Sequence, residues 1–163
     1  MEIRKVYEYA LEREREGKRF YIENADRFGH AAAVQVFKEL AAVEQKHIEY
    51  IQAHLDALEG REDTGGAVDM DLDRPGMFVE RAESELMDQT VLEAMVPDLP
   101  VLRTAFLIER DFAEFYESAA DQAEGEAHEV LENLAEWERS HEKLFRDIYD
   151  AAFEEYSKMP WAG

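Results

Sequence analysis

The chain has 163 residues, of which 46% are hydrophobic, and this length and content suit one compact domain with a single core. Its 39 acidic and 18 basic residues give a formal net charge of −21, which disfavours binding to nucleic acid or to anionic membrane surfaces. The absence of cysteine excludes disulfides, iron–sulfur clusters and thiol chemistry. Glycine and proline are scarce and strand patterns are lacking, so we expect an all-α protein.

The first half of the chain predicts a helix hairpin over residues 2–59. Hydrophobic and small residues recur at helical spacing from about residue 2 to residue 28, and Gly29 is expected to end this helix. A second helix is predicted from Ala31 to Leu58, with Gly60 as its stop.

Residues 60–100 differ in character and predict a long connector between two hairpins. We expect one short helix in it, from about Met77 to Met95, lying outside the core. Glycine and proline interrupt this segment at Gly65, Gly66, Pro75, Gly76, Pro97 and Pro100.

Two further helices, at about 102–124 and 126–156, predict a second hairpin over residues 101–157. The expected fold is a four-helix bundle that forms one domain over residues 1–163, with a long crossover connection carrying a short extra helix. Such a connection lets the third helix start at the opposite end of the bundle from the first.

The two predicted hairpins are repeats of one another. Phe20-Tyr21 returns as Phe115-Tyr116 after 95 positions, and Glu44-Gln-Lys-His47 returns as Glu138-Arg-Ser-His141 after 94 positions. Each half therefore contains a glutamate, a tyrosine seven residues later, and a Glu-x-x-His motif about thirty residues after the first glutamate. The repeated residues are Glu14, Tyr21, Glu44 and His47 in the first half and Glu109, Tyr116, Glu138 and His141 in the second.

This repeated pattern predicts a site for two metal ions inside the bundle. A glutamate and a histidine three residues apart share one helix face, and hydrophobic neighbours place that face toward the core. Four buried carboxylates exceed what two histidines can neutralise, whereas two divalent cations balance them. Carboxylate oxygens with one imidazole per ion suit iron or manganese, with zinc as another possible occupant. Glu16 would replace Glu14 if the first helix were rotated.

These motifs resemble the ferritin-like di-iron carboxylate superfamily, and within it the rubrerythrin-like (erythrin) branch, over nearly the whole chain. The resemblance implies two iron ions bridged by Glu44 and Glu138. It also implies that each ion has terminal ligands, which are Glu14, Glu109, His47 and His141. Tyr21 and Tyr116 correspond to the tyrosines that support the ligands in this family.

The sequence departs from rubrerythrin at two points. The four cysteines of a rubredoxin domain are missing, so electrons would come from another protein or a small reductant. Rubrerythrins also carry an extra glutamate three residues after the third-helix ligand, where this chain has Phe112. The remaining symmetrical set of six ligands is closer to that of bacterioferritin.

The resemblance implies a non-haem di-iron oxidoreductase that reduces hydrogen peroxide or dioxygen, in a role against oxidative stress. The alternatives are a ferroxidase or iron-handling protein whose substrate is Fe²⁺, and a metal-free acidic helical scaffold. We expect a cytoplasmic protein, because no leader-like or membrane-spanning hydrophobic run is present. A homodimer is the simplest assembly to expect. Trp137 is interpreted as a packing residue or an electron-transfer group, and His54 as a packed or capping residue.

Overall fold

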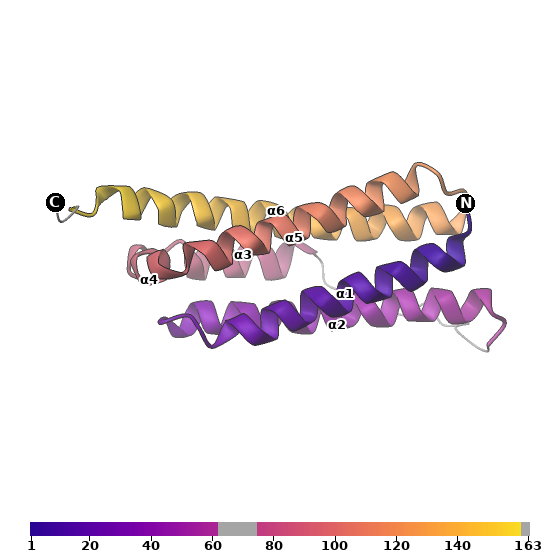
Figure 1. Ribbon diagram of the computed structural model, residues 1–163, viewed down its shortest axis with the longest axis horizontal. Helices are drawn as coiled ribbons and strands as arrows, with labels where there is room; N and C mark the ends of the chain where they lie inside the picture. The colour runs from indigo at the N-terminus through magenta and orange to yellow at the C-terminus, as the bar shows by residue number, and fades with distance from the viewer. Residues whose placement is uncertain (62–74, 161–163) are drawn as a thin grey trace.

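Two antiparallel helix hairpins lie side by side along the length of the molecule (Figure 1). The computed structural model describes residues 1–61 and 75–160, and these residues are helical with no strand among them. The hairpins consist of α1 (Ile3–Ala25) with α2 (Ala31–Leu58) and of α5 (Leu99–Ala120) with α6 (Glu126–Lys158). α1 and α5 start at opposite ends of the bundle, as the long connector predicts. The all-α, ferritin-like bundle expected from the sequence is confirmed.

The ends of α1 and α6 differ from the predicted ones, whereas those of α2 agree. α1 stops at Ala25, and Phe28 leaves the helix to pack into the core with 5% exposure, so Gly29 is not the helix-ending residue. α2 has the predicted bounds, and Gly60 follows it with a φ of 62°, in the left-handed region that glycine tolerates best. α6 runs two residues past the predicted end, to Lys158.

The connector contributes to the core, and the prediction that it lies outside was wrong. It holds two helices instead of one, α3 (Pro75–Leu86) and α4 (Gln89–Met95), followed by the 3₁₀ turn η1 (Val96–Asp98). Asp88 separates α3 from α4 because its side chain accepts a hydrogen bond from the backbone N–H of Thr90 at 2.9 Å. Buried residues of these helices pack against α6, namely Phe78, Ala82, Leu86, Val91, Leu92 and Met95. The predicted interruptions at Gly65 and Gly66 lie outside the described residues.

The core consists of two hydrophobic clusters that follow one another along the bundle. On α2, Leu40 belongs to one cluster and Ile51 to the other. On α6, Leu134 and Phe145 are divided in the same way. The polar residues of both Glu-x-x-His motifs therefore lie between two layers of apolar side chains, where water has little access.

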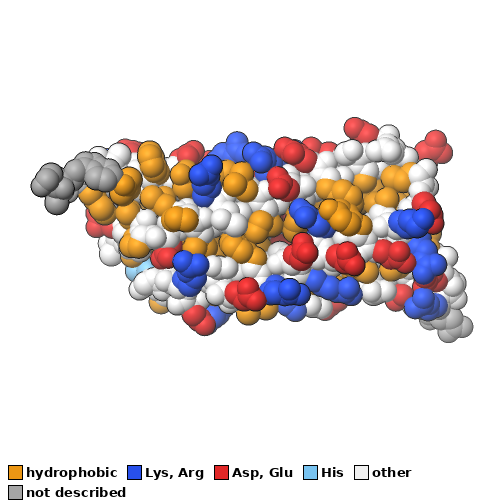
Figure 2. Space-filling view, viewed as in Figure 1, with side chains coloured by type: hydrophobic (Ala, Val, Ile, Leu, Met, Phe, Trp, Pro, Cys, Tyr) orange, Lys and Arg blue, Asp and Glu red, His pale blue; other side chains and the backbone are white. Residues whose placement is uncertain are grey.

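The surface mixes both signs of charge with scattered hydrophobic side chains on the face that Figure 2 shows. Within residues 1–61 and 75–160, no helix has both the length and the hydrophobicity needed to cross a bilayer.

Candidate metal centre

The side chains singled out from the repeat meet at the middle of the bundle. Seven polar or charged residues are buried in the described part of the chain, and six of them are Glu14, Glu44, His47, Glu109, Glu138 and His141. The four glutamates are completely buried, at 0% exposure, and each histidine is 2% exposed. Glu16, the alternative to Glu14, is on the surface with its side chain 65% exposed. The rotation of α1 therefore selects Glu14.

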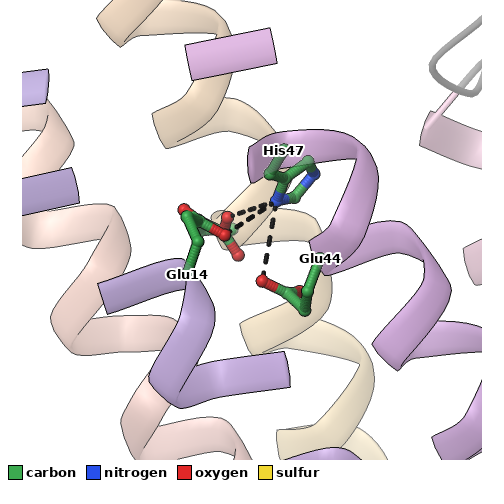
Figure 3. Close-up of side chains that lie close together, drawn as sticks. Glu14, Glu44 and His47 are labelled. Atoms are coloured by element: carbon green, nitrogen blue, oxygen red, sulfur yellow. Dashed lines mark hydrogen bonds and ion pairs between the residues drawn. The ribbon is translucent and has the colours of Figure 1, made fainter. Parts of the chain in front are cut away.

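The imidazole of His47 points into a group of carboxylates (Figure 3). Its Nδ1 atom lies 3.3 Å from Glu14 Oε2 and 3.7 Å from Glu44 Oε2. The same nitrogen lies 2.9 Å from Glu138 Oε1, which reaches it from α6 in the other hairpin. Three different helices thus supply the groups around one nitrogen.

The second imidazole has a matching environment related by the repeat. Nδ1 of His141 lies 3.5 Å from Glu109 Oε2, 3.4 Å from Glu138 Oε2 and 3.9 Å from Glu44 Oε1. The imidazole rings of His47 and His141 stack with centroids 5.8 Å apart. The two sets of side chains are therefore adjacent.

Glu44 and Glu138 belong to both sets. One set is Glu14, Glu44, His47 and Glu138, the other is Glu44, Glu109, Glu138 and His141, and within each set one atom per residue lies within 4.8 Å of the others. Each set offers three carboxylates and one imidazole. This buried cluster fits a di-iron site, in which two carboxylates are shared between neighbouring ions.

The two tyrosines of the repeat cross between the hairpins. The hydroxyl of Tyr21 on α1 donates a hydrogen bond to Glu109 on α5, and that of Tyr116 on α5 donates one to Glu14 on α1. Both tyrosines are fully buried, and burial raises the pKa of each hydroxyl well above its usual value. The phenols therefore stay protonated and act as fixed donors to one oxygen of each glutamate.

The four carboxylates of the site lack a basic partner from lysine or arginine among the described residues. The seventh buried polar residue, Glu142, shows the ordinary solution, because it pairs with Arg139 and Arg146. Several site oxygens also lack a hydrogen-bond partner, namely both of Glu44, both of Glu138 and Oε2 of Glu109. Buried charge without compensation is costly, and oxygens of this kind are the donors that a divalent cation requires.

The pKa shifts of the metal-free site show how strongly burial and neighbouring carboxylates disfavour negative charge on Glu44 and Glu109. Burial and then the neighbouring Glu138, Glu14 and Glu109 raise the pKa of Glu44 well above its usual range. Burial and then Glu138 raise the pKa of Glu109 to about 8. Without metal, these carboxyls retain protons at neutral pH.

Glu138 behaves in the opposite way to Glu44, although the two occupy equivalent positions in the repeat. Burial alone would raise its pKa, but His47 and His141 outweigh burial and hold it well below its usual range. Burial likewise disfavours the charged form of His141, yet contacts with Glu109 and Glu138 raise its pKa to about 9. The metal-free site is thus a charged carboxylate held between two imidazolium rings.

Three features around the site could not be identified from the repeat. The indole of Trp137 stacks on His47 at 5.3 Å between centroids, whereas the ring of Phe78 meets His141 edge-on at 5.9 Å. Phe112 lies over Gly17, where an added Cβ atom would come within 2.9 Å of its ring. A tryptophan directly before Glu138 was a visible signal, whereas nothing in the connector sequence pointed to Phe78.

The family comparison supports this interpretation from a separate direction. Residues 100–160 match the family model described as Rubrerythrin. The second hairpin is therefore similar in sequence to this family. The match confirms the resemblance to rubrerythrin-like, ferritin-like di-iron proteins, and it includes Glu109, Glu138 and His141. Comparison with curated proteins and comparison with solved structures each gave no significant match.

The rubrerythrin match covers α5 and α6, whereas Glu14, Glu44 and His47 lie before it. The internal repeat and the shared geometry connect those residues to the matched half. Each half supplies one carboxylate from its first helix and a Glu-x-x-His motif from its second, and the four helices present them to a common centre.

Proposed function

We propose that the protein is a non-haem di-iron oxidoreductase that reduces hydrogen peroxide or dioxygen. The observation that supports this most strongly is the set of buried carboxylate oxygens of Glu44, Glu109 and Glu138, which have no hydrogen-bond partner beyond ion-pair contacts with the two histidines. Glu44 and Glu138 would bridge the two ions. Glu14 with His47 would complete one ion's ligands, and Glu109 with His141 the other's.

The donor set favours iron, since hard carboxylate oxygens with one imidazole nitrogen per ion suit Fe²⁺ and Mn²⁺, with Zn²⁺ as a further occupant. Two bound ferrous ions would supply the electrons for reducing a peroxide or dioxygen molecule. The protein's part is to hold the ions close together, to exclude water and to keep the ligands in place.

The residues around the ligands perform these tasks. Tyr21 and Tyr116 each fix one oxygen of a terminal glutamate by donating a hydrogen bond, which would leave the other oxygen available to a metal ion. The apolar clusters on either side keep the site dry, which strengthens the interaction between ligands and ions. Phe112, which lies over Gly17, stands at the sequence position where rubrerythrins carry an additional glutamate, so the proposed centre has six protein ligands.

A ferroxidase is the second candidate, and the charge of the protein favours it. A formal net charge of −21 would attract Fe²⁺ toward the molecule. In that case Fe²⁺ is the substrate, and the same six residues would bind it for oxidation and release it afterwards.

Reaction of the reduced, iron-loaded protein with each oxidant separates these functions. We expect faster reoxidation by hydrogen peroxide than by air, followed as the absorption of the oxidised di-iron centre. Preference for air with continued turnover of added Fe²⁺ would instead establish the ferroxidase. A protein whose melting temperature is unmoved by Fe²⁺ or Mn²⁺ would be a metal-free scaffold.

A further inference from the structure

A row of aromatic rings leads from the metal centre toward one end of the bundle. The indole of Trp137 stacks on the imidazole of His47, with centroids 5.3 Å apart and planes inclined by 16°. The ring of Tyr50 lies 5.4 Å from that indole, and the ring of His54 lies 4.6 Å from Tyr50. Successive rings are therefore in contact from a proposed ligand outward.

The row ends at the protein surface. Tyr50 is buried at 5% exposure, whereas the side chain of His54 is 21% exposed and pairs with Glu126 at 3.3 Å. His54 lines a surface pocket of about 320 Å³ where α2 ends and α6 begins. The other residues of this pocket are Tyr7, Ala57, Leu58, Glu124, Glu126 and Ala127.

Core packing alone does not account for these rings, because the repeat shows what packing requires. The position equivalent to Trp137 holds Val43, the position equivalent to Tyr50 holds Leu144, and the position equivalent to His54 holds Ile148. Leu144 and Ile148 are buried at 2% and 0% exposure. Aliphatic side chains thus fill the same places in the other hairpin.

Burying the hydroxyl of Tyr50 also costs more free energy than burying the leucine found at the equivalent position. The hydroxyl of Tyr50 has one long contact, a hydrogen bond of 3.5 Å from the side-chain amide of Asn133. A leucine would bury no hydroxyl and would need no partner. Tyr50 and His54 on α2 and Trp137 on α6 thus keep polar or oxidisable rings along one line that ends at His47.

We propose that Trp137, Tyr50 and His54 form an electron relay from the pocket beside Tyr7 to the metal centre. This inference rests on the proposed redox function. The partner is a one-electron reductant that carries positive charge, because Glu124 and Glu126 line the pocket and the protein is strongly acidic.

Each transfer through the relay balances in electrons. With iron bound, Trp137 would pass one electron through His47 to the oxidised centre, and the external reductant would return one electron to Trp137 across Tyr50 and His54. The indole keeps its N–H proton throughout, so no base is needed beside it. The reductant is oxidised by one electron and one iron is reduced, and two transfers restore the ferrous pair after a peroxide and two protons have become two waters.

The relay can be tested in metal-free protein, because the chain has no cysteine and only two tryptophans. Leu58→Cys places one thiol at the pocket for a ruthenium–bipyridine photo-oxidant, and Trp161→Phe leaves Trp137 as the only indole. After a flash with an external electron acceptor, we expect the indole radical of Trp137 in transient absorption. Tyr50→Leu, which copies the other hairpin, should slow its formation about tenfold.

The control places the same label on the other side of the site. The control label is carried by Met77→Cys, because Met77 is 62% exposed and precedes Phe78, the ring that touches His141. The radical should form more slowly from this position. Equal rates from the two labels would overturn the relay without involving any metal.

Iron-loaded protein gives the second readout, reduction of the oxidised centre by hexaammineruthenium(II). Trp137→Phe should slow this reduction about tenfold, Trp137→Tyr should restore most of the rate, and Phe78→Leu should leave it unchanged. A packing role would not distinguish tyrosine from phenylalanine at position 137. Wild-type reduction in Trp137→Phe would overturn the relay, whereas a wild-type protein that binds no iron would overturn the proposed function.

Discussion

The two hairpins agree in the residues that meet at the centre and differ in the residues behind them. Both provide a glutamate, a tyrosine and a Glu-x-x-His motif, and each tyrosine donates to the glutamate of the other hairpin. Behind the imidazoles the symmetry ends, with Trp137 stacked on His47 and the connector residue Phe78 against His141. The shared residues correspond to what two metal ions require, and the unshared ones give each side of the site its own surroundings.

The same difference extends to charge. Glu44 and Glu138 are equivalent in the repeat, yet Glu138 lies 2.9 Å and 3.4 Å from the two imidazole nitrogens, and Glu44 lies 3.7 Å and 3.9 Å away. One carboxylate is therefore the counter-ion of both histidines in metal-free protein, whereas the other retains a proton. Bound metal would make their roles equal again.

The largest difference between the hairpins is expected when each of these two glutamates is replaced by glutamine. Without metal, Glu138→Gln should lower the free energy of unfolding by about 3–5 kcal/mol, because two buried imidazolium rings lose their counter-ion. Glu44→Gln should change it by less than about 1 kcal/mol, since an amide replaces a protonated carboxyl. Denaturant unfolding of chelator-treated protein measures both values, and equal losses would contradict the assigned charges. Both variants should fail to bind two metals.

The pH dependence of stability should separate the metal-free from the metal-loaded protein. The folded-state pKa values of about 8 for Glu109 and about 9 for His141 exceed their ordinary values of 4.5 and 6.5. Folded protein thus holds protons that unfolded protein releases, so the metal-free form should lose stability as the pH rises from about 5 to about 9.

The stabilisation that metal binding provides should increase with pH, although the stability of the metal-free form falls. Ligands bind metal when deprotonated, so the melting temperature of the loaded protein should exceed that of the metal-free protein by a margin that grows with pH. Melting curves from about pH 6 to about pH 9 test this expectation. A margin that shrinks with rising pH would argue against carboxylate and imidazole ligation.

Loss of either tyrosine hydroxyl should weaken metal binding to a similar extent. Tyr21→Phe frees an oxygen of Glu109, and Tyr116→Phe frees one of Glu14. Each change should weaken metal binding about 10–100-fold, the usual effect of losing a hydrogen bond that orients a ligand. Competition with a chelator of known affinity gives the two values. A loss confined to one variant would mean that the two metal positions are not equivalent.

The smallest change in stability is expected at Gly17 and Phe112, which are equivalent positions of the two hairpins and lie against each other. Gly17→Ala would push its Cβ atom into Phe112, at a cost of about 1–3 kcal/mol that the better helix propensity of alanine offsets by about 1 kcal/mol. Gly29→Ala is the matched control, because a Cβ atom there meets nothing within 4 Å. Phe112→Leu should relieve the Gly17→Ala defect in thermal unfolding.

Much of this arrangement could be predicted from sequence because it repeats. Helical periodicity placed α2 correctly, and the paired Glu-x-x-His motifs singled out side chains that the structure buries together. The helix predicted in the connector was wrongly placed outside the core because the glycines and prolines around it suggest a surface segment, although Phe78, Ala82 and Leu86 recur at helical spacing and pack against α6. Contacts such as Trp137 on His47 depend on how helices from different hairpins face each other, which periodicity alone does not determine.

Metal analysis of protein from iron-supplemented cells tests the central proposal most directly. If the six buried side chains form a di-iron centre, the wild-type chain will contain two irons, and Glu44→Gln and Glu138→Gln will each lose the pair while keeping the helical circular dichroism of the wild type. Fewer than one metal per wild-type chain, or two irons retained in both variants, would contradict the proposal.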